Sequence, residues 1–126
     1  MPASVVAPDL TPDGVLGLYA DIERRLSRHL DGRGDPPLAL VDRQLPEDGL
    51  ARLMSRLRVP GVLDGVDLVL ATSGSRSSRP HLVGLSWEAI VASANATRRY
   101  LGADGTWWLT LSPHHIAGLQ VVVRSV

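Results

Sequence analysis

The chain has 126 residues, a formal net charge of zero and no cysteine. The neutral charge gives no electrostatic reason to expect nucleic acid or an anionic membrane as a partner, and the missing cysteines exclude disulfides, zinc–thiolate sites and thiol nucleophiles. With 44% apolar and 21% charged residues, the composition predicts one folded domain over residues 1–126 rather than a disordered chain. All 13 basic residues are arginines, so no lysine is available to hold a phosphate.

The sequence predicts neither a signal peptide nor a membrane span. The first residues, Met1–Leu10, contain no basic run and no long apolar core. The most apolar stretches, Val66–Ala71 and Ile116–Val123, are far shorter than the roughly 20 residues needed to cross a bilayer. We therefore expect a cytoplasmic protein without a membrane partner.

The first predicted element is a helix that begins at Thr11-Pro12-Asp13 and ends at Asp31-Gly32. A threonine can cap the helix, proline is tolerated at the first helical position, and an acidic residue there complements the helix dipole. The apolar residues repeat at helical spacing and are Val15, Leu18, Tyr19, Ile22, Leu26 and Leu30. We place Arg24, Arg25 and Arg28 on the opposite face.

Two short aliphatic runs, Leu38–Val41 and Val66–Ala71, predict buried strands. A second helix lies between them, beginning at Pro46-Glu47-Asp48 and ending before Pro60-Gly61. The second strand runs straight into a polar segment that begins at Thr72.

The remainder of the chain continues the alternation of helices and strands. Ser86 is placed to cap a third helix that runs to Leu101 and stops at Gly102. Thr106–Leu111 is predicted to be a strand, and a last helix follows His114-His115. Because the final apolar segment reaches Val126 without a cap or a polar tail, we expect the chain to be cut from a longer one.

The fold class that follows is α/β, with a mainly parallel sheet flanked by helices. The strands at residues 38–41, 66–71 and 106–111 are expected to share one sheet.

The segment Thr72–Pro80 is the most informative part of the sequence. It contains four serines, one threonine, one glycine and two arginines, and it follows a buried strand at the position where open α/β sheets bind ligands. Hydroxyls, free backbone N–H groups and arginines can surround phosphate oxygens, which favours a phosphate-binding loop. The alternative is a solvated surface loop, which composition alone favours. The sequence contains neither a Walker A loop nor a nucleophile elbow. On either interpretation we expect these residues to be exposed and irregular.

Two linked motifs resemble the landmarks of adenylate-forming (AMP-binding) acyl-CoA ligases. Ala71-Thr72-Ser73-Gly74-Ser75, followed by Arg79-Pro80 and Val83, is similar to the signature loop of that superfamily. Leu109–Gly118, with His114-His115 at its centre, looks like the second landmark. A narrower match, to actinobacterial o-succinylbenzoate–CoA ligases of menaquinone biosynthesis, is carried by three segments that resemble theirs: Ala92–Thr97, Trp107-Trp108-Leu109 and His114–Gln120. The resemblance covers residues 66–126, and the first half of the chain matches only in general layout.

The resemblance implies the amino-terminal part of an adenylate-forming large domain. The activity it implies is activation of a small carboxylic acid with ATP and Mg²⁺, followed by thioester formation with CoA. The residues that it assigns to the ATP phosphates are Thr72, Ser73, Gly74, Ser75, Arg76, Arg79 and His81. It places His115 beside the acyl-substrate pocket as the catalytic candidate, with a histidine that caps the last helix or lies in the core as the equal alternative. No metal-binding residue is assigned in this chain.

The sequence departs from the superfamily where its chemistry is expected. Arg76-Ser77-Ser78 replaces the usual Thr-Gly pair, His81 stands at the lysine position and Leu82 at the following glycine. Leucine does not supply the positive φ and close backbone approach that glycine does. The superfamily's metal-binding acid and catalytic lysine lie beyond the second landmark. We therefore expect the chain to be inactive alone and to need the remainder of the same enzyme. The alternative is a non-catalytic, truncated or degenerate remnant that binds nucleotide weakly or not at all.

Overall fold

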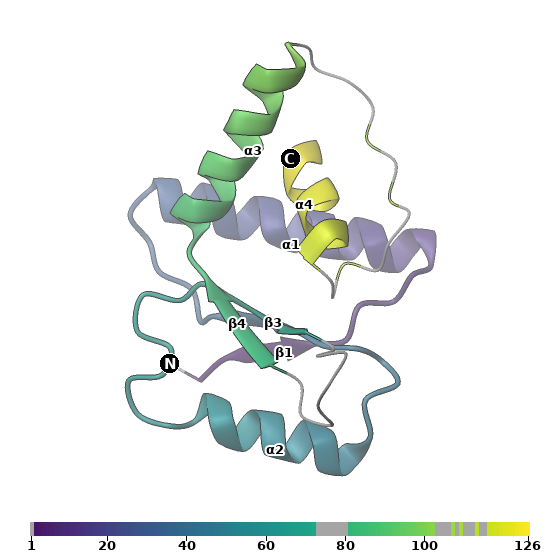
Figure 1. Ribbon diagram of the computed structural model, residues 1–126, viewed down its shortest axis with the longest axis vertical. Helices are drawn as coiled ribbons and strands as arrows, with labels where there is room; N and C mark the ends of the chain where they lie inside the picture. The colour runs from purple at the N-terminus through teal and green to yellow at the C-terminus, as the bar shows by residue number, and fades with distance from the viewer. Residues whose placement is uncertain (1, 73–80, 103–106, 108, 110–112, 114–115) are drawn as a thin grey trace.

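The computed structural model describes residues 2–72, 81–102, 107, 109, 113 and 116–126. Within these residues, the chain forms both helices and strands (Figure 1). In chain order they are β1 (Ser4–Val6), α1 (Pro12–Leu30), β2 (Leu38–Leu40), α2 (Glu47–Leu57), β3 (Leu68–Thr72), β4 (His81–Leu85), α3 (Trp87–Leu101) and α4 (Ile116–Ser125). The predicted α/β class is confirmed.

The sheet has the strand order β1-β2-β3-β4 and is mostly parallel. β1, β2 and β3 are parallel, with Leu40 opposite Leu70, whereas β4 is antiparallel to β3. The sequence predicts two of these strands and misses the other two. β1 lies in the amino-terminal segment, for which the sequence analysis predicts no strand. β4 lies in the residues between the polar segment and the third helix. The predicted strand at 106–111 lies mostly outside the described residues.

Helices cover both faces of the sheet. Figure 1 shows α2 on one face and α1, α3 and α4 on the other. Successive side chains of β3 point to opposite faces of the sheet. Leu68 and Leu70 lie in the core under α1, α3 and α4, and Val69 lies in the core under α2. All three side chains are at most 3% exposed. The sheet is therefore the middle layer of three.

The predicted helix boundaries agree with the observed ones. Thr11 caps α1 by accepting a hydrogen bond from the N–H of Gly14, and Ser86 caps α3 by accepting one from Ala89. Gly102 ends α3 with a φ of 67°, in the left-handed region that favours glycine. α2 begins after Pro46 and has no side-chain cap. Each of these residues lies directly beside the helix end that it marks, which explains why sequence alone located the boundaries.

Arg25 corrects the predicted arrangement of the arginines on α1. The sequence places it on the solvent face, yet only 6% of its surface is exposed. Its Nε donates to Asp21 Oδ2 at 3.0 Å and its Nη1 donates to the carbonyl oxygen of Pro36 at 2.7 Å. Arg28 Nε lies 3.0 Å from Asp35 Oδ1 and so holds the same loop. The arginines therefore fasten the segment 31–37 to α1 and fix where β2 begins.

The Asp21 carboxylate is ionised in this network. Partial burial raises its pKa, but hydrogen bonds from Arg24 and Arg25 outweigh that effect, so the pKa lies below the ordinary aspartate value. Because the folded-state pKa is depressed, this stabilisation is complete above the unfolded-state pKa of about 3.9. It is lost as the pH falls through the lower, folded-state value.

Two glycines of α1 form a matched pair for testing the packing at its first turn. A Cβ on Gly14 would lie 2.5 Å from the carbonyl oxygen of Asp9, whereas a Cβ on Gly17 would meet nothing within 4 Å. We expect Gly14→Ala to lower the free energy of unfolding by about 1–3 kcal/mol through overpacking. Gly17→Ala is expected to raise it by about 0.5–1 kcal/mol through helix propensity. Urea denaturation measures both values, and a stabilising Gly14→Ala would contradict the close approach of Asp9 to Gly14.

The buried arginine gives a second test. Arg25→Ala is expected to reduce the free energy of unfolding by about 2 kcal/mol or more, because it leaves a carbonyl and a carboxylate without their donor. Arg24 is the matched control: it shares Asp21, but its side chain is 52% exposed, so Arg24→Ala is expected to cost less than about 1 kcal/mol. Equal losses in urea denaturation at pH 7 would show that burial of Arg25 is unimportant.

Candidate functional site

The candidate site lies at the carboxyl edge of the parallel strands. β3 ends at Thr72 and β4 begins at His81, and these two residues are direct partners in the antiparallel ladder. The intervening residues 73–80 therefore leave and re-enter the sheet at neighbouring points. This edge is where open α/β sheets bind ligands, since the ends of parallel strands and the loops that follow them meet there.

The sequence-predicted phosphate residues are only partly described. Thr72 is the last residue of β3, which corrects the expectation that it begins the irregular segment. His81 is exposed at the first position of β4. The other five candidates, Ser73, Gly74, Ser75, Arg76 and Arg79, lie outside the described residues, as does the prediction that their segment is irregular. The structure thus brings Thr72 and His81 together and leaves the remaining assignments as predictions.

Leu82 shows why one departure from the superfamily motif is compatible with the fold. It lies inside β4, opposite Ala71, and its side chain packs against the core under α2. Among the described residues, no residue other than glycine has a positive φ. A leucine therefore fits this position in the strand, and the absence of glycine here costs no backbone strain.

Sequence reasoning did not identify an ion pair at the same edge of the sheet. Arg43, in the loop after β2, places Nη1 3.0 Å from Oδ1 of Asp9, in the loop after β1. Oδ1 of Asp9 also accepts a hydrogen bond from the N–H of Thr11 at 3.1 Å. That backbone bond is the main cause that lowers the pKa of Asp9, and Arg43 adds to it. The sequence feature that could have indicated this pair is that Asp9 and Arg43 each follow a short strand, β1 and β2.

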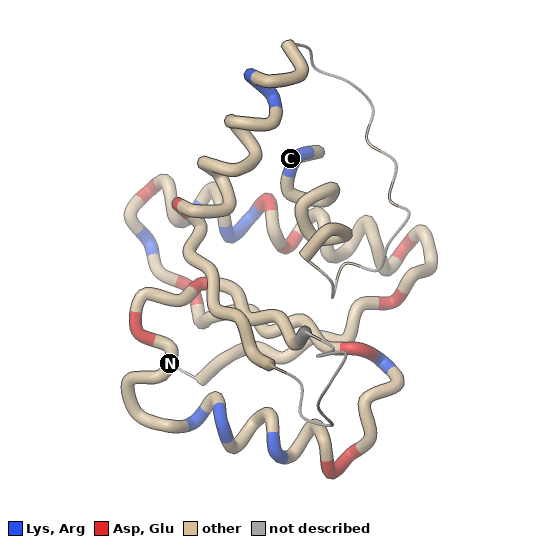
Figure 2. Tube along the Cα trace, in the orientation of Figure 1, with Lys and Arg blue, Asp and Glu red and all other residues tan. Residues whose placement is uncertain are grey.

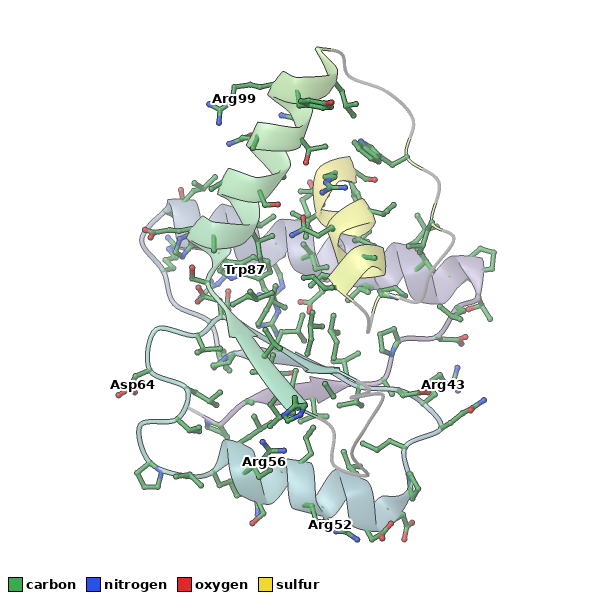
Figure 3. The ribbon with its side chains drawn as sticks, in the orientation of Figure 1. Arg43, Arg52, Arg56, Asp64, Trp87 and Arg99 are labelled. Atoms are coloured by element: carbon green, nitrogen blue, oxygen red, sulfur yellow. The ribbon has the colours of Figure 1, made fainter. Side chains whose placement is uncertain are left out.

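The ion pair joins the β1–α1 and β2–α2 loops beside the end of β3. Figure 3 shows Arg43 at this end of the sheet and Asp64 at the opposite end. Both side chains of the pair are about half exposed, at 58% for Arg43 and 46% for Asp9. The pair links the two loops but remains open to solvent, so its contribution to stability is small.

A pocket of 560 Å³ lies at the opposite, amino edge of the sheet. Its walls come from the residues before the strands and from the carboxyl end of α2, and include Pro37, Met54, Leu57, Asp64 and Val66. The end of β3 at Thr72 and the start of β4 at His81 lie at the other, carboxyl edge.

The second landmark is described only through its flanks. His114 and His115 lie outside the described residues, so the placement of the catalytic candidate is untested. On either side, Pro113 is fully buried and α4 begins at Ile116. Leu109 packs against the core under α1, α3 and α4, and the guanidinium carbon of Arg124 lies 5.3 Å from the centre of the Trp107 ring. The contact with Arg124 indicates that Trp107 packs within the domain.

The described residues do not fit a magnesium ion. In the part of the chain that the structure covers, no group of three or more histidine or acidic side chains is arranged to hold a metal. At the carboxyl edge, Asp9 is already paired with Arg43, and Asp42 accepts a hydrogen bond from the N–H of Gln44. We therefore derive no chemical step through a metal. Likewise, no described helix has the length and apolarity to cross a membrane.

Comparison with known proteins confirms the resemblance to acid–CoA ligases. Two curated relatives, from Mycobacterium tuberculosis strains CDC 1551 / Oshkosh and ATCC 25618 / H37Rv, are both named "Probable 2-succinylbenzoate--CoA ligase". Each is 42% identical over 96 residues, which is 75% of this chain but 24% of the relative. The chain thus matches about a quarter of the length of these relatives. No protein-family model and no solved structure matches it.

Proposed function

We propose that the chain is the amino-terminal part of a 2-succinylbenzoate–CoA ligase of menaquinone biosynthesis, working in the cytoplasm. In this reaction a carboxylate oxygen of the acid attacks the α-phosphorus of ATP and pyrophosphate leaves. The CoA thiol then attacks the acyl carbon, and AMP leaves with the bonding electrons as the thioester forms. The observation that carries the proposal is the 42% identity to the mycobacterial relatives over three quarters of the chain.

The contribution proposed for this chain is to hold the ATP phosphates. The pairing of Thr72 with His81 supports this contribution. Both ends of the serine- and arginine-rich segment are thereby attached to the carboxyl edge of the sheet. Backbone N–H groups and hydroxyls of residues 72–75 would surround the phosphate oxygens, and Arg76 and Arg79 would supply charge-assisted hydrogen bonds. His115 would lie beside the bound acid. Magnesium belongs to the proposal only as the counterion of ATP.

The isolated chain is proposed to be catalytically inactive. The sequence contains no lysine to stabilise the developing charge. Removing one such electrostatic group typically costs about 100- to 1,000-fold in rate. Groups that act as a unit do not contribute additively, so the loss of several leaves little activity above background.

A non-catalytic remnant is the second candidate. The observation that favours it is the replacement of the usual loop residues by Arg76-Ser77-Ser78 and His81. The two candidates differ in what they predict for nucleotide binding, because a working phosphate loop needs its arginines and a remnant does not.

Titration with ATP separates the two candidates. We expect ATP to shift the amide NMR signals of Thr72 and His81, which flank the loop, and Arg79→Ala to weaken binding about tenfold by removing a charge-assisted contact. Arg33→Ala is the matched control. Arg33 is also an exposed arginine, but it lies in the segment 31–37 that joins α1 to β2, away from the predicted phosphate residues in sequence. No shift at either flank, or equal weakening by the two substitutions, favours the remnant.

A further inference from the structure

The 560 Å³ pocket at the amino edge of the sheet has the size of a small-molecule site, since such sites have volumes of roughly 300–1,000 Å³. Its lining comes from three parts of the chain: the start of β1, residues 35–37, and residues 54–66 from the end of α2 to the turn before β3. Of the predicted phosphate residues that the structure describes, neither Thr72 nor His81 lines it. We call this cavity the amino-edge pocket.

One wall of the amino-edge pocket is held in place by α1. The buried Arg25 donates from Nη1 to the carbonyl oxygen of Pro36 at 2.7 Å. Arg28 Nε lies 3.0 Å from Oδ1 of Asp35, whose side chain is only 14% exposed. Residues 35–37 are therefore fixed by bonds that point away from the pocket and that need no ligand.

The opposite wall is a series of tight turns after α2. The N–H of Asp64 donates to the carbonyl oxygen of Gly61 at 3.2 Å, and the N–H of Val66 donates to that of Leu63 at 3.1 Å. Gly61 has a φ of 80°, in the left-handed region that favours glycine. Both walls are thus built by bonds within the protein, as in pockets that exist before their ligand binds.

The inner surface of the pocket is apolar and continuous with the core under α2. Leu57 belongs to that core, and Leu63 and Val66 pack against it. Met54 is half-buried and Val59 is 55% exposed, so apolar area remains open to solvent in the free protein. An apolar group that entered the pocket would remove this area from water, which favours binding.

The polar groups of the pocket favour a positively charged ligand. The last turn of a helix leaves carbonyl oxygens without partners inside the helix, and Leu57 and Arg58 at the end of α2 line the pocket. The partial negative charge of that helix end attracts cations. Asp64 on the rim adds a full negative charge, and among the described residues its carboxylate has no partner. The carboxylate of Asp35 is already paired with Arg28.

Arg58 is the group on the lining that opposes a cation. It is exposed and, within the described part of the chain, its guanidinium has no partner. Figure 2 shows basic positions on α2 and an acidic one on the loop that follows it, where Figure 3 marks Asp64. The two charges of opposite sign therefore give substitutions with opposite expected effects.

We propose that the amino-edge pocket binds a small amine, with its apolar part against Leu57, Leu63 and Val66 and its ammonium group between the end of α2 and Asp64. The carbonyl oxygens of the helix end accept hydrogen bonds from the ammonium group, and Asp64 supplies the opposite charge. This site does not depend on the proposed ligase function.

The test uses the phenethylammonium ion as the probe and follows the amide NMR signals of Met54, Leu63 and Val66 in the intact 126-residue chain. We expect these signals to shift with a Kd on the order of 1 mM, as suits a ligand of so few atoms. The matched anionic probe is 3-phenylpropanoate, which has the same ring and spacer. It is expected to bind at least about threefold more weakly, because the helix end and Asp64 repel it.

Three substitutions of exposed charges examine the proposed contacts. Asp64→Asn is expected to raise the Kd of phenethylammonium about two- to fivefold, the range of a solvent-exposed charge pair. Arg58→Ala is expected to lower it, because a like charge is removed. The control is Glu23→Gln, on an exposed residue of α1 across the sheet from α2, which is expected to leave the Kd unchanged.

Three outcomes would overturn the proposal: no shift of the pocket signals with the amine, equal binding of the amine and the carboxylate, or equal effects of Asp64→Asn and Glu23→Gln. The ATP titration reports on Thr72 and His81 at the other edge of the sheet. Failure of either titration therefore leaves the other conclusion standing.

Discussion

β3 is the constraint on which the rest of the fold depends. Leu68 and Leu70 are at most 2% exposed on one face of the sheet, and Val69 is 3% exposed on the other. A strand with apolar residues on both faces needs helices on both, which accounts for α2 on one side and α1, α3 and α4 on the other. It is also hydrogen-bonded on both edges, to β2 and β4. The same strand ends at Thr72, opposite His81, so the strand that organises the core also sets the edge of the sheet at which the candidate site begins.

The sequence predicted those parts of the fold that depend on neighbouring residues. The caps at Thr11, Ser86 and Gly102 act within a turn of their helices, and the aliphatic run of β3 needs no partner to be recognised. β4 was missed because its identity as a strand comes from pairing with β3, and Gly84 interrupts its apolar pattern. Arg25 was misplaced because its burial depends on the carbonyl of Pro36, which only the tertiary fold brings near. The spacing of apolar residues along the chain carries no information about either of these long-range contacts.

For the site, the sequence identified the segment and the edge of the sheet but not its supports. The order of strand and polar segment was enough to predict that residues 73–80 follow the carboxyl end of β3. Two features needed coordinates: the return through His81 directly opposite Thr72, and the ion pair of Asp9 with Arg43 that joins the neighbouring loops. The chemistry came from neither composition nor geometry but from the resemblance of two motifs, which the relatives named as 2-succinylbenzoate–CoA ligases support.

The function proposed for this chain depends on its being a working part of an acid–CoA ligase. The most direct measurement mixes it with the polypeptide beyond the aligned segment of the mycobacterial relative and follows CoA thioester formation from 2-succinylbenzoate, ATP and Mg²⁺. We predict thioester in the mixture, background with either component alone, and a large loss with Arg79→Ala in this chain. A mixture that associates yet forms no thioester, or a relative-derived polypeptide that is fully active without this chain, would contradict the proposed function.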